Sequence, residues 1–197
     1  MIKNFEYLNL FPIPVMVVDA DLPHKEIADY AREQLAPTNK YTSYYENEMN
    51  AAMCERMPSG RKFRDLVERL GRDFANHNQY QRELNLILSW WFSVYAEGDD
   101  HCLHIHPGAM ISGTYYAYSD EDSVPIRFRA PHYTHAMATS LGVLSENAVW
   151  HFFKPKTGQI LLWPSWLEHQ VGKQPPVDEG RERVALSFNL SEKQINH

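Results

Sequence analysis

The hydrophobic residues of this chain change their spacing near residue 83, and that change limits the folds the sequence can adopt. From residue 84 to residue 94, within ELNLILSWWFSVY (83–95), hydrophobic side chains stand at every second position, and the positions between them include the polar Asn85, Ser89 and Ser93. A period of two is the pattern of a β-strand with one buried face. Further segments of strand-like composition are an opening strand at 11–20, a strand that carries His104 and His106, and 111–119, 124–130, 148–153, 158–164 and 182–190.

Before residue 83 the period is helical. Residues 21–37 and 59–78 carry apolar side chains at helix spacing, and Asp21 is placed to cap the first segment. Residues 38–58 are polar and rich in tyrosine and methionine, which predicts a loop that could act as a lid. The segment PKTG at 155–158 predicts a hairpin turn. Many short strands after two helices favour a mainly β fold, a sheet sandwich or barrel with an α-helical flank.

Length and composition narrow the class of protein. A chain of 197 residues with 44% hydrophobic residues fits one domain, 1–197, in which residues 21–78 form the helical flank. The net charge of −6, without a basic stripe, argues against nucleic-acid binding. Two unpaired cysteines, no signal peptide and no membrane-spanning stretch lead us to expect a cytoplasmic protein without a membrane partner. The oligomeric state stays open, a homodimer included.

The segment HCLHIHP at 101–107 holds a candidate metal site. Side chains two positions apart on a strand point to the same face, so His104 and His106 are expected to project together, with Cys102 on that side. Two neutral imidazoles on one face can share a divalent metal. The alternative, two surface histidines on a strand, is about as well supported by these residues alone. A third ligand is available in LLWPSWLEHQV, where His169 opens a later strand.

Arg183 stands on the strand RVALSFN, on the same face as Ala185, Ser187 and Asn189. If this face is interior, the guanidinium is buried and requires an anionic partner. No carboxylate stands at a neighbouring position on that face, so the carboxylate of a bound ligand becomes a candidate. The alternative is a surface arginine that pairs with Glu182 or Glu179.

Several motifs together give the chain a family resemblance. They are HIHP (104–107), SGTYY (112–116), PKTGQILLWPSWLEH (155–169) and RVALSFN (183–189), with the opening segment LNLFPIPV. The chain resembles the 2-oxoglutarate- and Fe(II)-dependent oxygenases of bacteria and phages, over about residues 9–190. The resemblance implies a double-stranded β-helix, or jelly roll. It also implies iron held by His104, His106 and His169, and 2-oxoglutarate whose far carboxylate pairs with Arg183.

The sequence departs from this family pattern in three places. Trp163 replaces a phenylalanine before PSW, Ala185 replaces a serine that could help to bind the co-substrate, and His132 stands where an arginine is usual. Ser187 is the residue that could replace the lost hydroxyl. His106 takes the position of the carboxylate in the usual set of two histidines and one carboxylate.

Other residues are weaker candidates for the site. Tyr116 and Tyr118 are expected on one strand face and Tyr115 on the other; Tyr116 lines the co-substrate pocket or packs in the core. Asp100 is the first rival carboxylate ligand, and Glu168 is a weaker one because it should face away from His169. Trp90, Trp91, Trp163 and Trp166 could wall the cavity or fill the core. His101, His132, His135 and His151 remain unassigned.

The resemblance implies a dioxygenase that uses Fe(II), 2-oxoglutarate and O2. It is expected to hydroxylate a C–H bond of a small molecule or of an amino-acid or peptidyl side chain, with release of succinate and CO2. One alternative is a cupin-like metal-dependent dioxygenase that does not use 2-oxoglutarate, against which Arg183 argues. The other is a non-catalytic, metal-stabilised binding protein.

Overall fold

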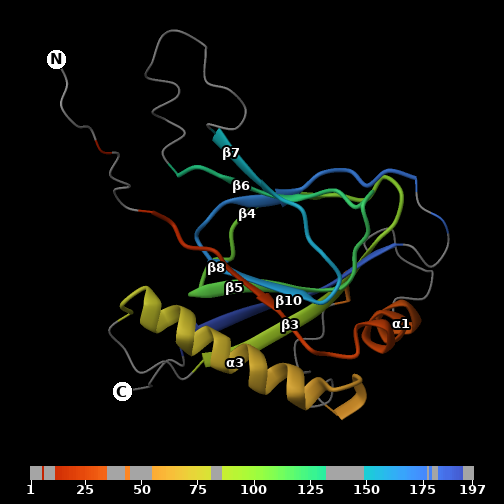
Figure 1. The fold of residues 1–197 in the computed structure, drawn as a ribbon, viewed down its shortest axis with the longest axis horizontal. Helices are drawn as coiled ribbons and strands as arrows, with labels where there is room; N and C mark the ends of the chain where they lie inside the picture. Colours follow the sequence, from red (N-terminus) through yellow and green to blue (C-terminus); the bar gives the residue numbers. More distant parts are fainter. Residues whose placement is uncertain are drawn as a thin grey trace, which may run out of the picture.

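The computed structural model describes residues 6, 12–34, 43–44, 55–80, 86–131, 149–176, 178 and 182–192. Two antiparallel β-sheets form its body, and the helices α1 and α3 cover the outer face of the larger sheet (Figure 1). The mainly β fold with a helical N-terminal flank, predicted from the change of period, is confirmed.

In the described part of the chain, the larger sheet has six strands in the order β1–β8–β5–β10–β3–β2. They are β1 (Met16–Asp19), β2 (Ser43–Tyr44), β3 (Leu86–Tyr95), β5 (Ile111–Tyr118), β8 (Gln159–Pro164) and β10 (Arg183–Glu192). The smaller sheet has the order β4–β9–β6–β7. Its strands are β4 (His101–His104), β6 (Ile126–Arg129), β7 (Trp150–Phe153) and β9 (His169–Val171).

The main core lies between the larger sheet and helices α1 (His24–Gln34) and α3 (Gly60–His77). Phe63 of α3 stacks on Trp90 of β3 with ring centroids 5.1 Å apart, and its ring also meets Phe188 of β10. Buried apolar area of this kind is the main stabilising term in a domain of this size. Among the described residues, no helix combines the length and the apolar character that a membrane span needs.

A second, smaller core fills the space between the two sheets. It contains Tyr95, Tyr116, Ile126, Phe128, Leu161, Trp163, Leu167, Val171 and Ala185. Neighbouring residues of one strand therefore serve different cores: Leu186 packs toward the helices, and Ala185 packs between the sheets. Each strand of the larger sheet thus separates an apolar helix-facing layer from a layer that also holds polar side chains.

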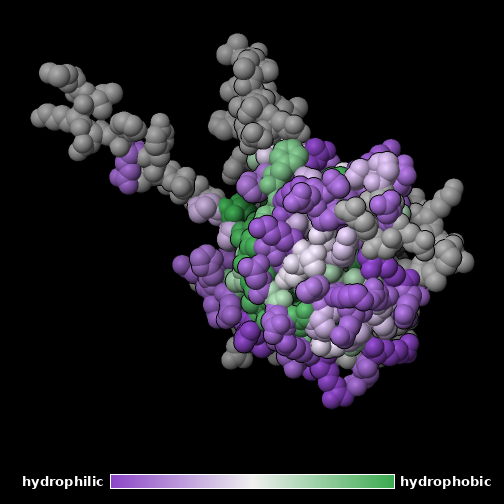
Figure 2. Space-filling model, turned by 45° about the vertical axis from the view of Figure 1, so that its right-hand side comes forward, coloured by the Kyte–Doolittle hydropathy of each residue, from purple (hydrophilic) through white to green (hydrophobic). Residues whose placement is uncertain are grey.

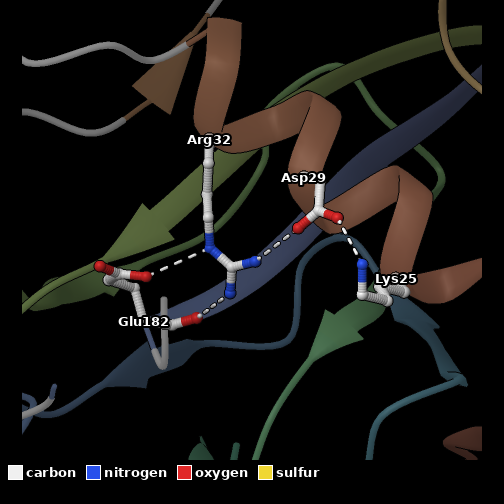
Figure 3. Close-up of polar contacts among 4 residues, drawn as sticks. All are labelled: Lys25, Asp29, Arg32 and Glu182. Atoms are coloured by element: carbon white, nitrogen blue, oxygen red, sulfur yellow. Dashed lines mark hydrogen bonds and ion pairs between the residues drawn. The ribbon is translucent and has the colours of Figure 1, made fainter. Parts of the chain in front are cut away.

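A chain of ion pairs ties α1 to the start of β10 (Figure 3). Arg32 donates from Nε to Glu182 Oε2 at 3.2 Å and from Nη1 to Asp29 Oδ1 at 3.3 Å, and Lys25 pairs with Asp29 at 3.2 Å. Arg32 also donates to the backbone carbonyl of Glu182. The carboxylate of Glu182, the residue before Arg183, therefore pairs with Arg32.

An apolar groove of about 510 Å³ lies between β1 and β7, the edge strands of the two sheets. Its walls include Ile13 and Val15 from the segment before β1, Val17 from β1, and Trp150 and Phe153 from β7. Figure 2 shows a strip of hydrophobic surface on one side of the molecule.

Two local expectations differ from the structure. The strands that PKTG joins, β7 and β8, lie in different sheets, so the turn at 155–158 crosses between sheets and does not close a hairpin. Tyr118 packs on the helix side with Tyr115, and only Tyr116 faces the space between the sheets. The cause is a bulge where β10 pairs with β5, between Val184 and Ala185, which breaks the alternation.

The bounds of several elements also differ from those expected. The first expected helix, 21–37, is observed as His24–Gln34, and its residues 35–37 lie outside the described residues. The expected opening strand, 11–20, is paired only over Met16–Asp19. Of the expected loop at 38–58, the structure describes 43–44, which pair with β3, and 55–58. Its expected role as a lid falls on residues outside the described ones.

Gly113 on β5 provides a test of this packing. A Cβ added there would lie 2.3 Å from Cζ of Phe188 and 2.5 Å from the backbone oxygen of Leu161. The Gly113→Ala variant should therefore lose about 2 kcal/mol of unfolding free energy in urea denaturation, as expected for an overpacked core. Gly172→Ala is the matched control, because its Cβ would meet only Val124 Cγ1 at 3.3 Å. Equal losses in the two variants would contradict the proposed packing at Gly113.

Candidate metal centre

Three histidines meet at one point, two from adjacent strands of the smaller sheet and one from the loop after β4. His104 is the last residue of β4, His169 is the first residue of β9, and the two are direct partners in the antiparallel ladder. His106 follows two residues after β4 ends, so it lies in the loop and not on the strand as expected. One ring nitrogen from each histidine lies within 4.8 Å of the others, and the Nε2 atoms of His106 and His169 are 3.3 Å apart.

The backbone fixes the tautomer of two of these rings. Nδ1 of His104 lies 2.7 Å from the carbonyl oxygen of Cys102, and Nδ1 of His169 lies 2.8 Å from that of Leu167. A carbonyl oxygen only accepts, so each Nδ1 carries the proton and each Nε2 keeps its lone pair. This is the arrangement in which imidazole ligands are oriented in metal sites.

The environment keeps the three imidazoles neutral. Burial, and after it the neighbouring His104, lower the pKa of His106 to about 4 and that of His169 to about 3. Burial also lowers the pKa of His104. Because a metal binds the neutral ring, protons do not compete for these nitrogens at neutral pH.

His101 belongs to the same cluster, although its role was not predicted. Its ring stacks on that of His104 with centroids 4.0 Å apart and an interplanar angle of 13°, and its Nδ1 lies 3.5 Å from the hydroxyl of Tyr95. Residues three apart on a regular strand point to opposite faces. A register irregularity of the β4–β9 ladder, between residues 101 and 104, brings the two rings together. Cys102, expected beside His104, is exposed instead.

Arg183 lies on the opposite side of the pocket and is only 3% exposed. Its Nη1 donates to the carbonyl oxygen of Val124 at 3.0 Å, and its guanidinium carbon lies 5.1 Å from the ring centroids of Tyr95 and of Tyr116. Its buried Nε has no hydrogen-bond partner, and among the described residues no carboxylate forms an ion pair with it. A buried cation with an unsatisfied donor fits the carboxylate of a ligand.

The pocket between the sheets brings these groups together. It is lined by Trp91, Tyr95, His101, His104, His106, Gly113, Thr114, Tyr116, Ile126, Trp163, His169, Val171, Arg183, Ala185 and Ser187. Ser187 lies 3.3 Å from Thr114, oxygen to oxygen. Burial raises the pKa of Tyr116 to about 12, so its hydroxyl keeps its proton, and that hydroxyl has no partner among the described residues. The donor set thus suits a metal on one wall and an anionic oxygen ligand on the other.

The rival carboxylates do not join this cluster. The group of residues that could hold a metal contains the three histidines and no carboxylate, within the described part of the chain. Glu168 forms an ion pair with Arg129, away from His169 as expected. Asp100 adjoins His101, whose pKa it raises slightly against the lowering by burial.

The remaining candidates fall in several places. Trp91 and Trp163 line the pocket, Trp90 packs against the helices, and Trp166 is 53% exposed. His151 is exposed on β7. His132 and His135 lie outside the described residues.

Comparisons with known proteins agree with this site. Residues 89–189, just over half of the chain, match the model of the family described as "Putative 2OG-Fe(II) oxygenase". The matched range contains all four of the motifs HIHP, SGTYY, PKTGQILLWPSWLEH and RVALSFN. A search of curated proteins finds no match.

Solved structures share the fold at low identity. A prolyl-4-hydroxylase from Pseudomonas putida is 15% identical with a TM-score of 0.60, over 92% of this chain and 94% of that one. HygX from Streptomyces hygroscopicus, with nickel and 2-oxoglutarate bound, is 13% identical with a TM-score of 0.52, over 92% and 83%. A prolyl hydroxylase from Trichoplax adhaerens, in complex with a peptide fragment of hypoxia inducible factor, is 13% identical with a TM-score of 0.57, over 90% and 83%.

These likenesses confirm the double-stranded β-helix with N-terminal helices. The family match implies Fe(II) and 2-oxoglutarate as cofactors, and the three converging histidines and the buried guanidinium with its unsatisfied Nε fit both. From a family match that covers more than half of its length, we conclude that the protein belongs to the 2OG-Fe(II) oxygenase family.

Proposed function

We propose that the protein is a dioxygenase that hydroxylates a C–H bond of a small molecule or of an amino-acid or peptidyl side chain. The observation that carries this proposal is the pairing of two features in one pocket. Three neutral histidines converge on one side, and on the other the buried guanidinium of Arg183 has no carboxylate partner among the residues that the structure describes. A dicarboxylic acid that chelates a metal at one end needs a cation at its other end.

His104, His106 and His169 would hold the iron through their Nε2 atoms. Three protein ligands leave three positions open for exogenous groups. Because all three ligands are neutral, the site keeps the full charge of the ion, where a carboxylate ligand would reduce it. This site would therefore attract an anionic co-substrate more strongly than a site with a carboxylate ligand would.

Arg183, Ser187 and Tyr116 would bind the far carboxylate of 2-oxoglutarate. Arg183 offers its unpaired Nε, and the Tyr116 hydroxyl is a buried donor beside it. Ser187 stands on the same face of β10 as Arg183, where it supplies the hydroxyl that Ala185 does not. When bound, Fe(II) and 2-oxoglutarate supply the oxidation: one atom of O2 enters succinate as CO2 is lost, and the other enters the substrate C–H bond.

The substrate would reach the iron through a second pocket that also has His104 in its wall. This pocket, of about 360 Å³, is lined by Ile105, Trp166 and Leu167 and by the Arg129–Glu168 ion pair. Ile105 and Trp166 are 43% and 53% exposed, which is unusual for large apolar side chains. A substrate with an apolar group next to the reacting C–H bond would cover them. The prolyl hydroxylases that share the fold act on side chains of that kind.

Two other functions are distinguishable from this one. A cupin-like dioxygenase would bind iron without 2-oxoglutarate. In such a protein the buried guanidinium of Arg183 would have no ligand carboxylate to pair with. A metal-stabilised binding protein would bind both cofactors and leave 2-oxoglutarate unconsumed. Succinate release in the presence of candidate substrates separates this last function from a hydroxylase.

Removal of the guanidinium tests the co-substrate site. Arg183→Ala should raise the Kd for 2-oxoglutarate by about 10- to 100-fold, the cost of losing charge-assisted hydrogen bonds. Isothermal titration of Mn(II)-loaded protein measures it, and the Kd for Mn(II) itself should not change. Arg64→Ala, on the exposed face of α3, is the control. An unchanged Kd for 2-oxoglutarate in Arg183→Ala would contradict the assignment.

The lowered pKa values predict how metal binding depends on pH. Burial lowers the folded-state pKa of all three ligands, to about 4 for His106 and about 3 for His169, so these two rings are already neutral at pH 5.5 and the affinity for Co(II) should persist below pH 6.5. Protonation of His106 and then of His169 should remove the affinity below about pH 4.5. Competitive titration with a chelator measures the affinity, and circular dichroism monitors acid unfolding. A steep loss that begins near pH 6.5 would contradict the effect of burial.

Substitution at residue 106 separates a ligand from a packing residue. His106→Asp restores the usual set of two histidines and one carboxylate, so the variant should keep iron. His106→Leu removes the donor and should lose iron while it stays folded. Metal content after gel filtration measures both. If both variants keep iron, His106 is not a ligand, and if His106→Asp unfolds, the residue has a packing role instead.

A further inference from the structure

A chain of polar side chains leads away from His106, and the proposed chemistry does not use it. Ser112 on β5 is the ladder partner of Asn189 on β10, and its Oγ lies 2.7 Å from Asn189 Oδ1. The same Oγ lies 2.8 Å from the Oγ of Ser165, just after β8. Both serines are only 1% exposed. At the other end, Nδ2 of Asn189 lies 3.4 Å from Nδ1 of His106.

These contacts define the direction of every proton. Ser112 has one hydroxyl proton, so it accepts from Ser165 when it donates to Asn189. The amide nitrogen of Asn189 only donates, so Nδ1 of His106 accepts. The neutral ring of His106 then carries its proton on Nε2, which faces Nε2 of His169 at 3.3 Å. Every donor in this chain points toward His169.

This tautomer conflicts with a ligand role for His106. Nε2 of His106 is the ring nitrogen that lies 3.3 Å from Nε2 of His169, and it can bind a metal only if it is not protonated. Its proton must therefore move to Nδ1, which then needs an acceptor where the amide nitrogen of Asn189 now lies.

Rotation of the Asn189 amide by half a turn supplies that acceptor. Oδ1 and Nδ2 exchange places, so Oδ1 accepts from Nδ1 of His106 and Nδ2 donates to Ser112 Oγ. Ser112 in turn donates to Ser165. Each of these groups keeps a hydrogen-bond partner before and after the rotation, because an amide and a hydroxyl can each donate or accept.

We propose that Asn189 is a positioning residue that selects which nitrogen of His106 carries the proton, and that its amide reverses when the metal binds. The inference rests on the proposed function, because it takes His106 as a ligand. An aspartate at this position could only accept, and would hold His106 in the metal-binding tautomer at all times. A leucine could do neither.

The test combines tautomer and affinity. Nitrogen-15 NMR of the imidazoles should find the His106 proton on Nε2 in metal-free protein and on Nδ1 after addition of Zn(II), a diamagnetic probe. In Asn189→Asp the proton should stand on Nδ1 before zinc is added, and zinc affinity should be kept. In Asn189→Leu zinc affinity should fall by about 10- to 100-fold, the usual cost of losing the partner of a ligand. Asn76→Leu, on the exposed face of α3, is the matched control.

The outcomes separate this inference from the proposed function. Wild-type protein that binds no zinc, Co(II) or Fe(II) would overturn the proposed function and the reversal with it. Wild-type protein that binds metal while Asn189→Leu keeps the same affinity and tautomer would overturn the reversal alone. So would an Asn189→Asp variant that binds zinc as weakly as Asn189→Leu, since that result requires the amide to donate in the metal-bound protein.

Discussion

The two faces of strand β10 hold the helix-side core and the pocket in a fixed relation. Leu186 and Phe188 are fully buried toward the helices, and Arg183, Ser187 and Asn189 face the space between the sheets. A slip of one residue would exchange these sets and would place a guanidinium in the apolar core, at a large free-energy cost. The continuous pairing of β10 with β3, from Arg183 to Glu192, therefore fixes where the co-substrate cation stands relative to the metal ligands.

Periodicity and residue type predict much of this arrangement. The change of period at residue 83 predicts the β-rich second half, and simple alternation places Arg183 and Ser187 on one face, which is the pocket face. His169 could be chosen as the third member of the cluster because it opens a strand after a proline break, and it is the ladder partner of His104. These inferences succeed because they need only the direction in which a side chain points.

Irregular pairing is what the sequence does not reveal. The bulge beside Ala185 turns Tyr118 to the helix side, and the irregular ladder at β4 brings His101 onto His104. The division of strands between two sheets is also hidden, since a turn such as PKTG looks alike whether it closes a hairpin or crosses between sheets. The contact of Asn189 with His106 joins residues 83 positions apart, and no local pattern predicts it.

The central claim is that a neutral three-histidine site and a buried arginine together bind Fe(II) and 2-oxoglutarate. An anaerobic titration of metal-free protein with Fe(II), followed by 2-oxoglutarate, tests this claim most directly. A visible charge-transfer band should develop only after both are present, because the co-substrate must chelate the iron. Iron that binds without any band on addition of 2-oxoglutarate, or no iron binding at all, would contradict it.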